Sequence, residues 1–136
     1  MSAMSMEGHK VGVIGAGAWG TALATAVARG GNEVQAWAME DDVVSSINNE
    51  HENKRYLAGY KLDPRLSAST DIEEVAACKE FLFLASPSLY LAPTIKKFTQ
   101  LPNLRDGSTI VAALTKGFIP SDGGPGLILP TVEAAL

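Results

Sequence analysis

Three glycines follow directly after a short apolar run near the start of the chain. They are Gly15, Gly17 and Gly20, at the spacing G-x-G-x-x-G, and the run before them covers residues 11–14. The first glycine permits a sharp turn, the second lets a diphosphate approach the backbone, and the third lets a helix lie close to the strand. A helix that begins at such a turn directs free N–H groups and its positive dipole end at the phosphates. The spacing therefore predicts a dinucleotide-binding turn, and the alternative is a glycine-rich turn that only packs tightly.

A strand over 10–14 and a helix over 18–29 are the elements that must hold this turn. The strand is apolar almost throughout, which is typical of a strand covered on both faces. Gly31 and the glycine before it are expected to end the helix. The predicted inner face of the helix consists of Trp19, Ala22, Leu23, Ala26, Val27 and Gly30.

A carboxylate about 20 positions beyond such glycines can accept hydrogen bonds from the hydroxyls of the adenosine ribose. Glu40 stands at that distance, after a predicted strand over 33–38. A carboxylate there repels a 2′-phosphate, and no arginine occurs in the ten residues that follow. The pattern therefore favours NAD over NADP. Asp41 and Asp42 are explained by the start of a helix over 42–49, where negative charge is favourable.

The rest of the chain alternates strands and helices. Strands are predicted over 66–69, 81–85 and 109–114. One helix is predicted to follow a capping box formed by Thr70 and Glu73, and a second is predicted from the shared face of Leu91, Ile95 and Phe98. A mobile segment is predicted over 120–126, and a last helix over 127–136. Such alternation gives a parallel sheet with right-handed crossovers. We therefore predict an α/β fold, a doubly wound parallel sheet of the Rossmann type with strand order 3-2-1-4-5. It would form a single domain over 10–136 behind a disordered leader over 1–9.

Composition excludes several other classes of protein. The 136 residues have a net charge of −4, which argues against a nucleic-acid partner. No apolar run approaches the roughly 20 residues of a membrane span, and the first ten residues lack a signal core. The single cysteine, Cys78, fits a reducing compartment and is expected to pack as a small apolar residue, so we expect a cytoplasmic protein. His9 and His51 lack metal-ligand spacing, so we predict no metal site and read both as solvated surface residues.

Three blocks, in this order, resemble the N-terminal cofactor domain of NAD-dependent glycerol-3-phosphate dehydrogenase. The first runs over 15–24 and has Trp19 inside the glycine motif; the second, over 53–59, has the pattern Asn-x-x-Tyr-Leu-x-Gly; the third is Thr115-Lys116-Gly117. The resemblance spans residues 11–118. Leu89 departs from the family, which has a polar residue at that position after Pro-Ser.

The resemblance implies reversible hydride transfer between NAD(H) and the pair dihydroxyacetone phosphate and glycerol 3-phosphate, a small phosphate-ester substrate. It implies that Ala18 and Trp19 touch the diphosphate through their backbone, that Met39 lies against the adenine with Glu40 beside it, that Pro87 and Tyr90 lie in the cofactor site, and that Lys116 lies between cofactor and substrate. The ammonium of this lysine could orient an anionic ester or polarise a developing alkoxide. A surface lysine is the alternative.

The lysine that acts as general acid and base in this family belongs to a substrate domain beyond residue 136. Because hydride transfer to a carbonyl needs that proton partner, we expect the 136 residues to bind NAD and to be inactive alone. Uncovered apolar surface on the last helix would favour self-association, for example as a homodimer. Two alternatives stay open: a stand-alone dinucleotide-binding regulatory module, and a dehydrogenase of another hydroxy acid.

Overall fold

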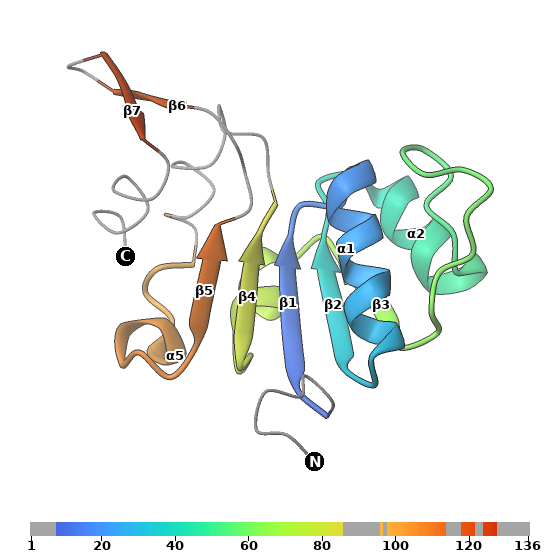
Figure 1. Cartoon of the computed structure of the whole chain (residues 1–136), viewed down its shortest axis with the longest axis horizontal. Coiled ribbons are helices and arrows are strands. Elements are labelled where there is room, and N and C mark those ends of the chain that lie inside the picture. Colours follow the sequence, from blue (N-terminus) through green and yellow to red (C-terminus); the bar gives the residue numbers. More distant parts are fainter. Residues whose placement is uncertain (1–7, 86–95, 97, 114–117, 122–123, 128–136) are drawn as a thin grey trace.

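A five-stranded sheet forms the centre of the computed structural model, which describes residues 8–85, 96, 98–113, 118–121 and 124–127. Figure 1 shows the elements in chain order. They are β1 (Lys10–Ile14), α1 (Ala18–Arg29), β2 (Glu33–Trp37), α2 (Asp41–Glu50), β3 (Leu66–Ser69), α3 (Ile72–Ala76), β4 (Phe81–Leu84), α5 (Pro102–Arg105), β5 (Ile110–Ala113), β6 (Phe118–Ser121) and β7 (Gly124–Leu127).

All five strands of the sheet run parallel, in the order β3-β2-β1-β4-β5. The predicted α/β fold and strand order are thereby confirmed. The chain moves outward from β1 in one direction and then returns to place β4 on the other side, so the order reverses between β1 and β4. In such sheets, ligands bind outside the carboxyl ends of the strands at this reversal.

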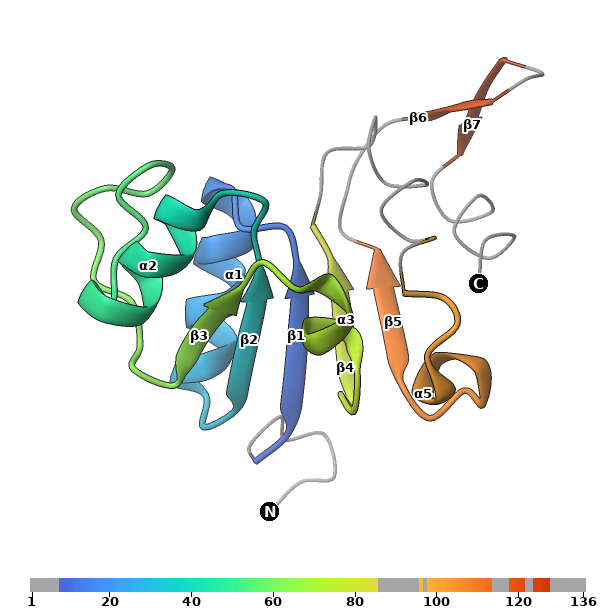
Figure 2. The same ribbon diagram turned by 180° about the vertical axis from the view of Figure 1, so that it is seen from behind.

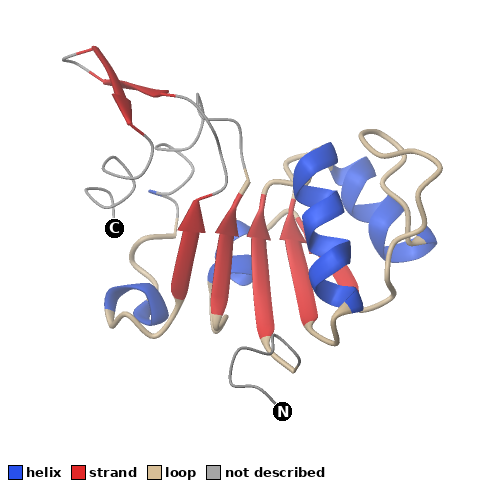
Figure 3. Ribbon diagram, viewed as in Figure 1, coloured by secondary structure: helices blue, strands red, loops and turns tan. Residues whose placement is uncertain are grey.

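Helices cover both faces of the sheet and divide the core into two clusters. Figures 1 and 2 show α1 and α3 on opposite faces, and Figure 3 shows the sheet between them. One cluster joins α1 and α2 to the sheet, through residues such as Ala24 and Ile47. The other joins α3 to the opposite face, through residues such as Val75 and Leu82. Burial on both faces explains why β1 is so apolar, since Val11 and Val13 are fully buried.

The predicted inner face of α1 is wrong. Trp19 is 61% exposed, Ala26 is exposed, and Ala22, Leu23 and Val27 are only partly buried. The residues that face the sheet are Gly20, Thr21, Ala24, Thr25 and Ala28. These residues are small, because α1 lies so close to the strands that the larger apolar side chains are displaced to its flanks.

Several local predictions also need correction. The helix α3 is capped by Asp71, which accepts hydrogen bonds from the backbone of Glu73 and Glu74, and not by a capping box from Thr70. Cys78 is exposed, with a positive φ of 55°, and does not pack as a core residue. His9 is only partly exposed, and its Nδ1 lies 2.9 Å from the Glu80 carboxylate.

The segment predicted to be mobile contains a strand pair. The strands β6 and β7 are antiparallel, with Phe118 opposite Leu127, so residue 127 does not begin a helix. Prolines fix φ at a value that extended backbone also adopts, so the Pro- and Gly-rich composition does not exclude strands here.

The predicted leader and two of the predicted helices lie largely outside the described residues, since the structure does not describe residues 1–7, 91–95 and 128–136. Phe98, from one of these predicted helices, is described and is buried. None of the described helices combines the length and apolar character that a bilayer crossing needs.

Candidate functional site

The turn after β1, residues 15–17, has the geometry that its glycines predict; we refer to it as the glycine turn. Gly15 has a φ of 120°, which only glycine adopts without strain. A Cβ on Gly20 would lie 2.0 Å from the carbonyl oxygen of Gly15 and 3.3 Å from the Cβ of Ala85. Gly20 therefore lets α1 contact both β1 and the end of β4.

Gly17 has a different reason to be glycine. Its φ of −73° suits any residue, and a Cβ there would meet nothing within 4 Å. The space above Gly17 is open, at the N-terminal end of a 12-residue helix. The backbone of α1 has no side-chain cap at this end and no acidic residue in its first turn. The first N–H groups of α1 and its positive dipole end therefore face this open space, which is suited to an anion.

Large side chains are exposed beside the glycine turn. Trp19 lies in the first turn of α1, and Met39, which is 74% exposed, follows the end of β2. Because β1 and β2 are neighbouring parallel strands, both side chains belong to segments that follow the carboxyl ends of these strands, on the same side of the sheet. Glu40 is the N-cap residue of α2 and makes no capping hydrogen bond with its side chain. This edge thus offers apolar surface next to a carboxylate.

The Glu40 carboxylate has a partner that the sequence did not reveal. Tyr56, from the loop between α2 and β3, donates a hydrogen bond from its hydroxyl to Glu40. This bond raises the pKa of the Tyr56 hydroxyl, because ionisation would place two negative charges side by side. Arg55 lies beside it: its guanidinium is 5.9 Å from the Tyr56 ring centroid, and its Nε donates to Asp42 at 3.1 Å. Asp42 therefore pairs with an arginine as well as lying in the first turn of α2.

Asn53 ties this loop to the glycine turn. The side chain is fully buried, and its Nδ2 donates to the carbonyl oxygen of Ala16 and to Oγ1 of Thr21, both at 2.8 Å. The Asn-x-x-Tyr block was the available signal, but the sequence pattern assigned no role to either residue. The sequence pattern did not predict Arg55 near Glu40, because Arg55 lies beyond the ten residues that follow Glu40.

The structure brings Gly15, Gly17, Ala18, Trp19, Gly20, Met39 and Glu40 to the carboxyl edge of β1 and β2. Pro87, Tyr90 and Lys116 lie outside the described residues. Within the described residues, no three His, Cys, Asp or Glu side chains gather in a way that could hold a metal ion.

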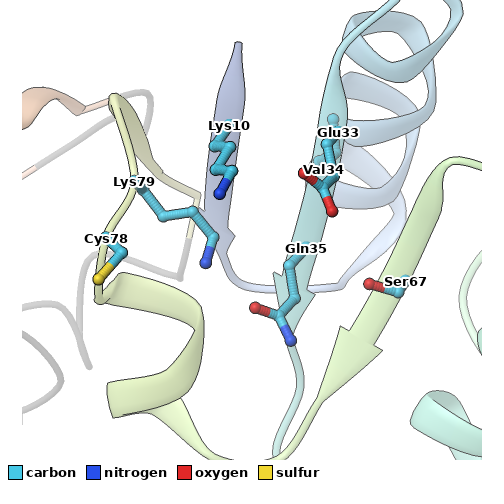
Figure 4. A pocket seen from close by; sticks show the side chains of 7 residues that line it. All are labelled: Lys10, Glu33, Val34, Gln35, Ser67, Cys78 and Lys79. Carbon is cyan, nitrogen blue, oxygen red and sulfur yellow. The ribbon is translucent and has the colours of Figure 1, made fainter. Parts of the chain in front are cut away.

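A separate pocket of about 230 Å³ lies at the opposite edge of the sheet (Figure 4). It is lined by Lys10, Glu33, Val34, Gln35, Ser67, Cys78 and Lys79. Lys10 and Glu33 begin β1 and β2, whereas the glycine turn follows the end of β1. Burial lowers the pKa of Lys79, whose ammonium donates to the carbonyl oxygens of Glu74 and Ala77. The pocket is therefore no part of the candidate site.

Comparison with known proteins decides the family. A family model described as the N-terminus of NAD-dependent glycerol-3-phosphate dehydrogenase matches residues 10–135. The chain belongs to this family. A glycerol-3-phosphate dehydrogenase (NAD(P)+) of Treponema denticola is 43% identical over 133 residues, 93% of this chain and 37% of that protein. One from Xanthomonas campestris is 40% identical over 120 residues, 88% of this chain and 34% of that protein.

Solved glycerol-3-phosphate dehydrogenases share the fold. The enzyme of Plasmodium falciparum superposes with a TM-score of 0.80 at 29% identity, over 96% of this chain and 38% of that one. The enzyme of Coxiella burnetii superposes with a TM-score of 0.74 at 33% identity, over 82% of this chain and 34% of that one. The chain thus spans little more than a third of the length of these glycerol-3-phosphate dehydrogenases.

Proposed function

We propose that the chain binds NAD(H) at the carboxyl ends of β1 and β2 and forms the cofactor half of a glycerol-3-phosphate dehydrogenase. The observation that carries the proposal is the open space above Gly17, faced by the uncapped N-terminus of α1. The polar groups at this site fit a dinucleotide: backbone N–H groups can donate hydrogen bonds to its diphosphate, and a carboxylate can accept hydrogen bonds from its ribose hydroxyls. When bound, the nicotinamide supplies a hydride acceptor or donor for dihydroxyacetone phosphate and glycerol 3-phosphate.

The residues of this chain bind and orient the cofactor. The backbone of Ala18 and Trp19 would hold the diphosphate, since their N–H groups lie in the uncapped first turn of α1. Met39 would lie against the adenine, for which its exposed side chain offers apolar surface. Glu40 would accept hydrogen bonds from the ribose, and its bond with Tyr56 would hold the carboxylate in place.

We also propose that NAD is preferred to NADP. The negative charge of Glu40 would repel a 2′-phosphate, and the nearby Arg55 is already paired with Asp42. The relatives that support the family are named for both NAD and NADP, so the preference is one of degree.

The nicotinamide side of the site is proposed from the family alone. Pro87 and Tyr90 would line it after β4, and Lys116 would lie between cofactor and phosphate ester after β5. The ammonium of Lys116 would orient the anionic ester or stabilise negative charge on the reacting oxygen. The proton partner would come from the substrate domain. A cytoplasmic location and a homodimer stay predictions.

A nucleotide titration tests the proposal. We expect the chain to bind NADH more tightly than NADPH, measured by the change in nucleotide fluorescence. Gly17→Val should weaken NADH binding by at least about tenfold, because its side chain fills the space that the diphosphate needs. Ala26→Val, on the exposed face of the same helix, is the control and should bind like the wild type. Binding of NADH by Gly17→Val at wild-type affinity would contradict the proposed site.

A further inference from the structure

Asn53 uses its buried amide to hold the glycine turn. The residue lies in the loop that follows α2, and its side chain is fully buried. Its Nδ2 donates one hydrogen bond to Ala16, the middle residue of the glycine turn, and another to the Thr21 hydroxyl in α1, both at 2.8 Å. Thr21 in turn donates its N–H to the carbonyl oxygen of Gly17 at 2.9 Å. Both amide protons of Asn53 thus fix the segment proposed to contact the diphosphate.

The two oxygen atoms of Asn53, Oδ1 and the backbone carbonyl oxygen, accept hydrogen bonds within the turn that includes Tyr56. Its Oδ1 accepts a hydrogen bond from the Tyr56 N–H at 3.1 Å, and its carbonyl oxygen accepts one from Leu57 at 2.9 Å. The Tyr56 hydroxyl then donates to Glu40, in the loop between β2 and α2. One buried residue therefore links the loop after β1 with the loop after β2, in addition to their link through the sheet.

We propose that Asn53 is a positioning residue for the dinucleotide, which sets the spacing between the glycine turn and the Tyr56–Glu40 pair. The inference rests on the proposed function, because it requires a ligand that spans both loops. A ligand that spans both loops loses affinity when the spacing between the loops changes, since it can no longer make good contacts with both loops at once. A ligand that contacts one loop only is much less affected. This difference separates positioning from a general loss of stability.

The chain contains a matched control. Asn103, in α5, also donates from Nδ2 to a backbone carbonyl and a threonine hydroxyl, those of Ala76 at 2.9 Å and Thr109 at 2.7 Å. These bonds join α5 to the end of α3 and to the residue that precedes the edge strand β5. Asn103→Ala therefore removes the same kinds of hydrogen bond without touching either loop of the candidate site.

The experiment compares three ligands with Asn53→Ala, Asn103→Ala and the wild type. NADH and ADP span both loops, whereas adenosine reaches only the Tyr56–Glu40 end; calorimetry gives the affinities, with adenosine measured by competition. We expect Asn53→Ala to weaken the binding of NADH and ADP by at least about tenfold, because it removes the three side-chain hydrogen bonds that join the glycine turn to the Tyr56 turn. It should weaken the binding of adenosine by less than about threefold. Asn103→Ala should lower the melting temperature and leave all three affinities within about twofold of the wild type.

Thr21→Val provides the second variant, because it removes one acceptor of Asn53 and conserves the shape of the side chain. It should weaken NADH and ADP by about threefold and leave adenosine unchanged, and it decides the matter if Asn53→Ala does not fold. Unchanged NADH affinity in a folded Asn53→Ala or Thr21→Val variant overturns the inference. An equal loss for adenosine and ADP also overturns it, because a structural effect would then suffice. A wild type that binds neither NADH nor NADPH instead refutes the proposed function itself.

Discussion

Glu40 provides the clearest single-residue test of nucleotide preference. Glu40→Gln removes the negative charge but retains an oxygen that can accept the hydrogen bond from Tyr56. We expect NADPH to bind about fivefold more tightly to this variant, since one charge repulsion of about 1 kcal/mol near water is removed. NADH should bind slightly less tightly, because a neutral oxygen is a weaker acceptor for the ribose hydroxyls. Paired fluorescence titrations of both nucleotides measure the change.

Asp41→Asn is the control, since it removes the neighbouring carboxylate of α2, which the proposed site does not use. Its ratio of NADH to NADPH affinity should stay close to that of the wild type. If Glu40→Gln and Asp41→Asn shift the ratio equally, net charge and not position determines the preference, and the proposed role of Glu40 is wrong.

Residues close in sequence to the glycines were predictable, whereas partners from a distant loop were not. The spacing of Gly15 and Gly20 indicates a turn and a close helix because both effects are local. Asn53 and Tyr56 reach Ala16 and Glu40 only after α2 has folded the chain back. A polar residue that becomes buried only through such a long-range contact shows no periodicity in the sequence that would predict its burial. The pattern Asn-x-x-Tyr-Leu-x-Gly was the only sequence feature that included these residues, and it did not indicate which groups they contact.

Strands were easier to predict than the face of a helix. A strand covered on both faces appears as a nearly continuous apolar run, as in β1 and β4, and both match their predicted ranges closely. The edge strand β3 also matches its predicted range, although its buried Leu66 and Ala68 alternate with the exposed Ser67. In α1, however, the residues against the sheet are selected for small size, so an apolar pattern identifies the wrong face. The strands β6 and β7 were missed because proline and glycine indicate a loop unless a pairing partner is known.

The contact between β1 and α3 yields a test at the level of elements. A Cβ on Gly12 would lie 2.6 Å from the carbonyl oxygen of Val75 and 2.8 Å from Cδ1 of Leu82. Because a backbone oxygen cannot move cheaply, we expect Gly12→Ala to lower the free energy of unfolding by about 1–3 kcal/mol. Urea denaturation measures the change. Gly30→Ala, whose Cβ would lie 3.3 Å from the carbonyl of Val27, should have a smaller effect, and equal losses would contradict the proposed crowding.

The molecule as a whole depends on the loop between α2 and β3, because this loop joins the candidate site to the edge strand of the sheet. It is anchored to α1 by Asn53 near its start and, near its end, by the Asp63 N–H, which donates to Oγ1 of Thr25 at 2.9 Å. The Asp63 carboxylate accepts hydrogen bonds from Nε and Nη2 of Arg65, both at 3.0 Å. These bonds lower the pKa of Asp63 from 3.8 to about 2.

This lowered pKa predicts a specific acid dependence of global stability. Between pH 3.8 and about 2 the unfolded chain binds a proton at Asp63 that the folded chain does not. The stabilisation by Asp63 is therefore complete above that range and is lost as the pH falls through it. Asp63→Asn should be less stable than the wild type at neutral pH, and its unfolding free energy should fall less steeply on acidification. Arg65→Gln should reproduce part of the change, because it removes the main cause of the shift. Urea denaturation from about pH 5 to 2 measures both, and parallel profiles for wild type and Asp63→Asn would show that the Asp63 carboxylate does not contribute to acid stability.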